Sequence, residues 1–83
     1  MSTTIASTSP AIPGMIRYRM PFNTYGALCA TTDASRGWDG GYLDPEHRAV
    51  WERDRFDYLD YVVWSYETPI AWHTVERGWY VPD

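Results

Sequence analysis

The sequence has a single cysteine, Cys29, and no lysine. A lone thiol cannot close a disulfide within the chain, so the fold has to be stable without a covalent crosslink. The chain carries seven cationic residues, all arginine, against eleven acidic residues, which gives a net charge of −4. Non-specific affinity for nucleic acid depends on cations that neutralise phosphates. The composition therefore argues against nucleic acid as a partner and favours a protein.

Targeting signals are also missing from the sequence. Residues 1–16 contain no Arg or Lys and are rich in Ser, Thr and Pro, unlike the charged start and apolar centre of a signal peptide. The longest uninterrupted apolar stretch runs only from Tyr61 to Trp64, whereas a membrane-spanning helix needs about 20 apolar residues. We expect a cytoplasmic protein with no membrane contact.

A chain of 83 residues can form one small core at most. Aromatic residues make up 17% of it, with five Trp, seven Tyr and two Phe. Aromatic side chains bury large areas and can compensate for a short chain. So many rings exceed what one small core can cover, and exposed rings are typical of interfaces. We expect a binding partner or a homodimer.

The N-terminal part is the least patterned. Residues 1–13 show no apolar periodicity and are predicted to be a disordered tail, followed by a single domain at residues 14–83. From Met15 to Met20, apolar and cationic residues alternate, which predicts a half-buried strand ended by Pro21. Asn23 can cap a short helix that continues to Ala30.

The middle of the chain predicts a loop and then a helix. Residues 31–42 are rich in Gly, Asp and Ser and are predicted to be an irregular loop. A helix is predicted from Asp44 to Phe56, because Asp44 can serve as the cap and Pro45 suits the first helical position. On its solvent face, Arg53 and Asp57 have the spacing of an ion pair.

The C-terminal third predicts strands. Residues 58–66 are apolar on both faces and indicate a central strand covered from two sides. A turn at residues 67–69 leads to a strand at 70–74, and a second turn at 75–78 leads to residues 79–81. The expected fold class is α+β, with an antiparallel sheet of three to four strands, a C-terminal meander and one or two short helices packed on one face.

The segments VWSYETPIAWH at residues 63–73 and GWYVPD at 78–83 resemble a family of small proteins encoded by phages of actinobacteria. The resemblance rests on a V-x-S-Y-x-T-P-I-A pattern and an aromatic return strand. It implies a strand-turn-strand unit and a phage origin, hence the cytoplasm of a host cell, but it implies no activity for particular residues.

Chemistry at a metal or a nucleophile is not indicated. The soft metal ligands His47, His73 and Cys29 lie in separate predicted elements without the spacing of a zinc site. Ser65 or Cys29 could pair with His73 only if the strand register brought them together. A turn centred between residues 67 and 68 instead places His73 opposite Val62. We expect no metal, no cofactor and no enzymatic activity, with His73 paired to a nearby carboxylate or carbonyl and Cys29 in the core.

The predicted function is a protein-protein interaction module that binds a host or phage protein, or itself. Its predicted surface consists of Trp38, Tyr42, Arg36, Trp72 and Trp79, since Trp, Tyr and Arg dominate interface hot spots. Trp51 and Trp64 are expected in the core. The alternative is a nucleic-acid-associated modulator that uses Arg17, Arg19, Arg53 and Arg55.

Overall fold

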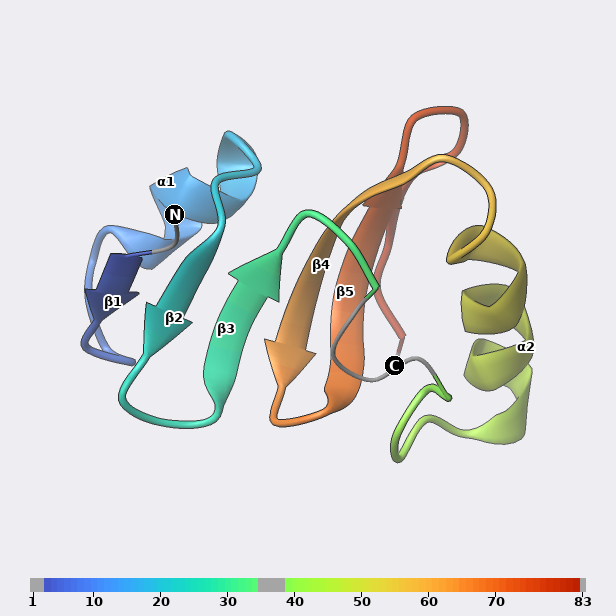
Figure 1. Cartoon of the computed structure of the whole chain (residues 1–83), viewed down its shortest axis with the longest axis horizontal. Coiled ribbons are helices and arrows are strands. Elements are labelled where there is room, and N and C mark those ends of the chain that lie inside the picture. The colour runs from blue at the N-terminus through green and yellow to red at the C-terminus, as the bar shows by residue number, and fades with distance from the viewer. Residues whose placement is uncertain (1–2, 35–38, 83) are drawn as a thin grey trace.

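The computed structural model describes residues 3–34 and 39–82, which form a mixed sheet flanked by two helices (Figure 1). The elements in chain order are β1 (Thr3–Ile5), α1 (Ile12–Arg17), β2 (Phe22–Thr24), β3 (Leu28–Thr31), α2 (Pro45–Asp54), β4 (Leu59–Ser65), β5 (Thr68–Thr74) and β6 (Gly78–Tyr80). The α+β class is confirmed, but the sheet is larger than the three to four strands predicted.

The sheet has six strands in the order of the sequence, β1-β2-β3-β4-β5-β6. β1 pairs with β2 in parallel, and α1 makes the connection between them. All later neighbours are antiparallel. The predicted C-terminal meander is therefore present, and β3 extends it on one side.

The additional strands come from segments for which the sequence predicted something else. Residues 3–5 were expected in a disordered tail but form β1, which pairs with β2 through its backbone and so needs no apolar pattern of its own. Ile5 packs against the core. Residues 23–30 were predicted to be a helix, but the chain turns at 25–27 between β2 and β3. The Thr24 hydroxyl stabilises this turn by accepting a hydrogen bond from the Gly26 N–H and donating one to the Leu28 carbonyl.

The strand predicted from Met15 to Met20 is also wrong, because these residues overlap a helix. Pro13 lies in the first turn of α1, where its missing N–H costs no hydrogen bond. Ile12, Met15 and Ile16 follow the i, i+3, i+4 spacing of one helical face and pack against the sheet. The segment is so short that its residues fit both the alternation of a strand and the spacing of a helical face. The pattern alone therefore could not distinguish the two.

The two helices cover opposite faces of the sheet, which corrects the prediction that helices pack on one face. Tyr61 and Val63 of β4 point toward α1, where Ile12 belongs to the same cluster. Val62 and Trp64 point the other way, toward α2. Figure 1 shows the helices at opposite edges of the sheet, α1 near β1 and β2 and α2 beyond β5. β4 is thus apolar on both faces because it is covered on both faces, as the sequence predicted.

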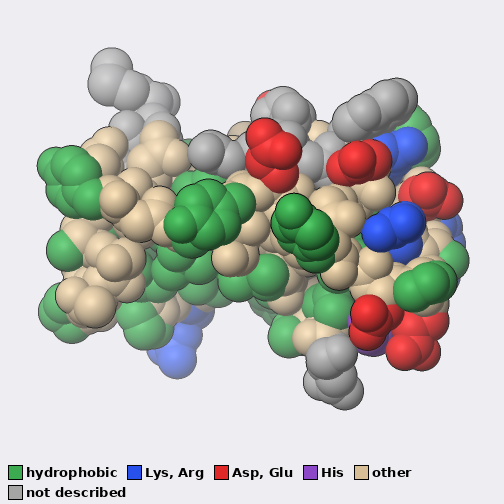
Figure 2. Space-filling view, turned by 90° about the horizontal axis from the view of Figure 1, so that it is seen from below, with side chains coloured by type: hydrophobic (Ala, Val, Ile, Leu, Met, Phe, Trp, Pro, Cys, Tyr) green, Lys and Arg blue, Asp and Glu red, His purple; other side chains and the backbone are tan. Residues whose placement is uncertain are grey.

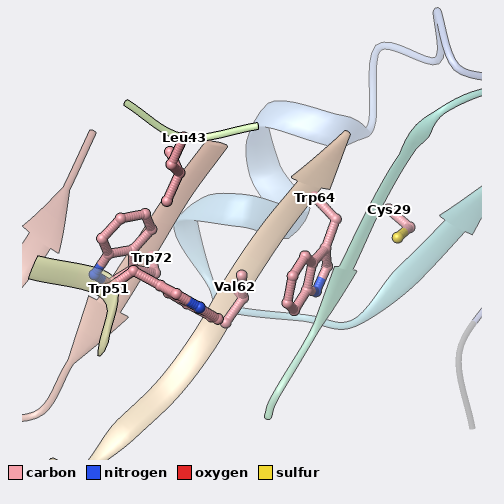
Figure 3. Packing of buried hydrophobic residues seen from close by; sticks show 6 residues of the cluster. All are labelled: Cys29, Leu43, Trp51, Val62, Trp64 and Trp72. Carbon is pink, nitrogen blue, oxygen red and sulfur yellow. The ribbon is translucent and has the colours of Figure 1, made fainter. Parts of the chain in front are cut away.

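The larger cluster forms under α2, around Trp51. The Trp51 ring packs edge-on against Trp64, with ring centroids 5.5 Å apart, and against Trp72, with centroids 5.0 Å apart. Tyr80 stacks on the other side of Trp72 at 4.9 Å. Figure 3 shows the labelled members of the cluster, Leu43, Trp51, Trp72, Val62, Trp64 and Cys29. Trp51 and Trp64 are core residues as predicted, and Cys29 is a small buried one.

A buried carboxylate, that of Asp54, fixes the end of α2 to the sheet. Asp54 is 2% exposed. Its Oδ2 accepts a hydrogen bond from Trp72 Nε1 at 2.8 Å, and its Oδ1 accepts from Arg77 Nη2 at 2.6 Å and from Arg53 Nε at 2.9 Å. Arg77 also pairs with Asp57 at 2.8 Å. Arg53 thus pairs with Asp54 and not, as the sequence predicted, with Asp57. Asp57 instead pairs with Arg77, which reaches it from the β5–β6 turn.

These contacts change the proton affinity of Asp54. Burial alone would raise the pKa of its carboxyl, but hydrogen bonds from Arg53, Trp72 and Arg77 outweigh burial and hold the pKa below its usual value. A carboxyl with a lowered pKa in the folded state adds stability above its unfolded pKa of about 3.9. That contribution is lost as pH falls through the folded pKa.

We predict that Asp54→Asn lowers the free energy of unfolding by about 3 kcal/mol at pH 7, because the buried side chain then loses its charge-assisted hydrogen bonds from Arg53 and Arg77. The deficit relative to wild type should shrink below about pH 4, where the wild-type carboxyl also becomes neutral. Urea denaturation between pH 2.5 and 7 measures both effects. Asp57→Asn, which removes only a partly exposed ion pair, should cost less than about 1 kcal/mol at pH 7. Equal losses in the two variants would contradict this role of Asp54.

Candidate functional site

Residues 3–34 and 39–82 form no pocket. Within these ranges, no group of three or more His, Cys, Asp or Glu side chains is arranged to hold a metal ion. None of the described helices has the length and apolar character that crossing a membrane requires.

The structure separates the residues predicted for a binding surface. Trp72 is fully buried against Trp51, so its prediction as a surface residue is wrong. Trp79 is 41% exposed, as expected. The two tryptophans point to opposite faces, because Trp79 pairs with His73 and Trp72 with Tyr80 across β5 and β6. Arg36 and Trp38 lie outside the described residues.

Tyr42, the remaining predicted residue, is 95% exposed and has two tyrosine neighbours at the same end of the sheet. Tyr25 lies in the β2–β3 turn and is 84% exposed, and Tyr66 lies in the β4–β5 turn and is 73% exposed. We call Tyr25, Tyr42 and Tyr66 the tyrosine rim. Figure 2 views the molecule from this end and shows large hydrophobic side chains projecting from it.

Two hydrogen bonds, one between backbone groups and one from backbone to side chain, join the three turns. The Tyr66 N–H donates to the Ala27 carbonyl at 2.9 Å, which ties the β4–β5 turn to the β2–β3 turn. The Tyr42 N–H donates to Thr68 Oγ1 at 3.0 Å, which ties the loop before α2 to the start of β5. The exposed rings therefore project from connected backbone rather than from independent loops.

The loop that carries Tyr42 is held from several sides. Asp39 Oδ1 accepts a hydrogen bond from the Gly41 N–H, and Arg48 Nη2 donates to the carbonyls of Gly41 and Leu43. Gly41 has a φ of 55°, and a Cβ there would lie 2.9 Å from the Glu67 carbonyl oxygen. Only glycine fits this position. The approach of the loop to the β4–β5 turn thus depends on Gly41.

Tyr66 occupies a backbone conformation that disfavours tyrosine. Ser65 pairs with Thr68, so Tyr66 and Glu67 form a two-residue turn, and Tyr66 has a φ of 55°. Such turns favour Asn or Gly, and a left-handed conformation costs other residues about 1–2 kcal/mol. The side chain is mostly exposed and gains little from burial. Neither the backbone nor the core explains a tyrosine at this position.

Sequence reasoning missed Tyr25 and Tyr66 as site residues. Tyr25 was placed in a helix, and the β4–β5 turn was centred one residue too far along the chain. In the structure Ser65 pairs with Thr68 and Tyr61 with His73, instead of the predicted pairing of His73 with Val62. The signal in the sequence was Tyr66, a bulky aromatic residue at a turn position, where small or polar residues are usual.

A second surface cluster surrounds His73 on the α1 face of the sheet. A register shift between Leu59 and Tyr61 makes Asp60 an additional residue on β4, and its Oδ1 lies 2.6 Å from His73 Nδ1. The Trp79 ring packs edge-on against His73 at 5.3 Å. The predicted pairing of His73 with a neighbouring carboxylate is confirmed.

Ser65 and Cys29, the two nucleophiles considered from the sequence, both lie away from the Asp60–His73 pair. Ser65 lies four residues along β4 from Tyr61, the partner of His73, which corresponds to about 13 Å at 3.3 Å per residue. Cys29 is buried in the cluster on the α2 face.

Tyr61 is buried, and burial raises its pKa to about 12, so its phenol stays protonated at neutral pH. Its hydroxyl donates to the Met20 carbonyl at 2.7 Å.

Two of the four arginines predicted for the alternative nucleic-acid surface, Arg19 and Arg53, contact carboxylates. Arg19 Nε lies 3.7 Å from Asp60, and Arg53 pairs with Asp54. Arg17 is exposed at the end of α1, and the Arg55 guanidinium lies 4.6 Å from the centre of the Phe56 ring. Carboxylates beside Arg19 and Arg53 reduce the positive field that phosphates would meet. The absence of nucleic acid among the partners stays a prediction.

No family model, no curated protein and no solved structure matches the chain. The resemblance to small phage proteins accordingly stays a prediction.

We predict that Tyr66→Asn leaves the free energy of unfolding unchanged or raises it by up to about 1 kcal/mol, because Asn tolerates the left-handed conformation. Thermal and urea denaturation measure the change. Tyr25→Asn is the matched control, since Tyr25 is exposed but has no positive φ, and it should bring no gain. A loss above about 1 kcal/mol in Tyr66→Asn would show that this tyrosine supports the fold.

Proposed function

We propose that this protein is a protein-protein interaction module and that the tyrosine rim is its interface. The observation that carries the proposal is the exposure of Tyr25, Tyr42 and Tyr66 on three turns that hydrogen bonds connect. Tyrosine provides a large contact area at a low cost in conformational entropy, and it is enriched in protein interfaces and antibody loops. Turns held in place before binding reduce the cost of association further.

The size of the rim suits a standard interface. Such an interface covers about 800 Å² of each partner, which is roughly 15% of the 5286 Å² accessible surface of this chain. One end of a molecule with principal extents of 31 × 25 × 22 Å can provide this area. The lack of a pocket in the described residues fits a flat protein partner better than a small molecule.

The partner that we propose is a protein of the host cell, with a phage partner or a second copy of the chain as the other possibilities. The phage resemblance of residues 63–73 supports a host target, since an accessory phage protein acts inside the infected cell. Trp79 lies outside the rim, next to His73 on the α1 face. It is therefore not part of the interface that we propose.

We predict that changing Tyr25, Tyr42 and Tyr66 together to Ser abolishes partner capture while the fold remains. Tagged wild-type and variant proteins are used to purify partners from host lysate, and mass spectrometry quantifies the proteins retained. Tyr18 and Tyr58 are 74% and 69% exposed but lie outside the rim. The double variant Tyr18→Ser/Tyr58→Ser is thus the matched control, and it should retain the partner.

Size-exclusion chromatography of the three proteins separates self-association from binding to another protein. A dimer that dissociates in the rim variant would make the second copy the partner. Equal retention of the same partner by wild type and the folded rim variant would refute the proposal.

A further inference from the structure

We propose that the tyrosine rim recognises a basic, arginine-rich segment of its protein partner. This inference rests on the proposed function, and it adds the chemistry of the partner. It follows from the charges that surround the rim and from the positions of the cations in the rest of the described chain.

Exposed acidic residues lie beside the rim. Glu67 follows Tyr66 in the β4–β5 turn, and Asp39 caps the Gly41 N–H in the loop that carries Tyr42. Asp44, also exposed, precedes α2 two residues after Tyr42. Figure 2 shows acidic side chains beside the projecting hydrophobic ones and, farther toward α2, acidic and cationic side chains next to each other. Carboxylates and aromatic faces are thus close together.

Within residues 3–34 and 39–82, cationic side chains near the rim are few. Arg48 is the described arginine closest to it in the fold, and its guanidinium is half-buried and donates to the carbonyls of Gly41 and Leu43. Arg53, Arg55 and Arg77 lie at the other end of the sheet, where α2 ends and β5 turns into β6. Arg19 is also at that end, because it pairs with Asp60 near the start of β4. The described part of the rim therefore has a negative local charge.

This combination suits arginine. A guanidinium packs on the face of a tyrosine ring through a cation–π interaction, and it forms directional hydrogen bonds with carboxylates. An acidic partner segment would instead meet Asp39, Asp44 and Glu67 with like charge, and nucleic acid would meet the same repulsion through its phosphates. Charge complementarity therefore selects a basic protein segment as the occupant.

The test uses three fluorescein-labelled peptides of 15 residues that are identical except at four positions, occupied by Arg, Gln or Glu. Fluorescence anisotropy at 20 mM and 200 mM NaCl measures their binding to wild-type protein. We expect the Arg peptide to bind at low salt, to weaken as salt is added, and to exceed the Gln and Glu peptides about tenfold or more in affinity. No binding of the Arg peptide, or equal binding of the Gln peptide, would overturn the inference.

Two variants locate the charge effect. Asp39→Asn/Glu67→Gln keeps the Asn oxygen that can accept from the Gly41 N–H but removes both charges, and it should weaken the Arg peptide about tenfold. Glu52→Gln/Glu76→Gln removes two exposed charges outside the rim and should change affinity less than twofold. An equal effect of the two double variants would show that only net charge matters, and would overturn the assignment to the rim.

Capture of the natural partner separates the two proposals. If the rim variant loses the partner but Asp39→Asn/Glu67→Gln retains it fully, the interface stands and its basic specificity is wrong. If the folded rim variant retains the partner, the interface itself is wrong. If both variants lose the partner, and Glu52→Gln/Glu76→Gln keeps it, both proposals are supported.

Discussion

The position of α2 depends on the carboxylate of Asp54. The apolar stripe of this helix is narrow, and within it only Trp51 is fully buried. Non-directional packing of one ring leaves a helix free to rotate or slide, whereas hydrogen bonds have defined directions. Asp54 provides such directions through Trp72 of β5 and Arg77 of the β5–β6 turn, and His47 of α2 adds a hydrogen bond of 2.7 Å with the Tyr80 hydroxyl of β6. Burying a carboxylate costs several kcal/mol, and its bonds to Trp and Arg donors offset that cost.

This constraint extends to the proposed interface. With its last turn fixed at Asp54, α2 directs its first turn toward the β4–β5 turn, and Arg48 of the same helix holds the carbonyls of Gly41 and Leu43. Tyr42 lies between these two residues. A buried carboxylate with its arginine partners at one end of the helix thus helps to place an exposed ring at the other. Long-range hydrogen bonds, rather than local sequence, account for the meeting of three separate turns.

The C-terminal half of the fold was predictable because its signals are local and strong. Asp44 and Pro45 mark the start of α2, and the β-branched and aromatic residues from Tyr61 to Trp64 favour a strand covered on two faces. The N-terminal half was not predictable, because β1 and β2 are three residues each and are defined by pairing with each other. In such short strands, long-range backbone pairing overrides weak local propensity.

Of the candidate site, the sequence predicted Tyr42, from its loop, but not Tyr25 or Tyr66. The predicted turn begins one residue too late, at Glu67, so the prediction counts Tyr66 as the last residue of the strand. A shift of one residue in register was enough to miss that Tyr66 lies in the turn. The same residue shows where local rules and structure disagree. A turn that favours Asn or Gly contains a large aromatic residue with its side chain in solvent. Natural sequences break local rules mainly at functional sites, and Tyr66 breaks one without any gain in packing that would explain it. Tyr58, which lies outside the rim, also combines a positive φ, of 60°, with a side chain that is 69% exposed, so this disagreement alone does not mark an interface. What distinguishes Tyr66 is its position on a turn that is hydrogen-bonded to the β2–β3 turn.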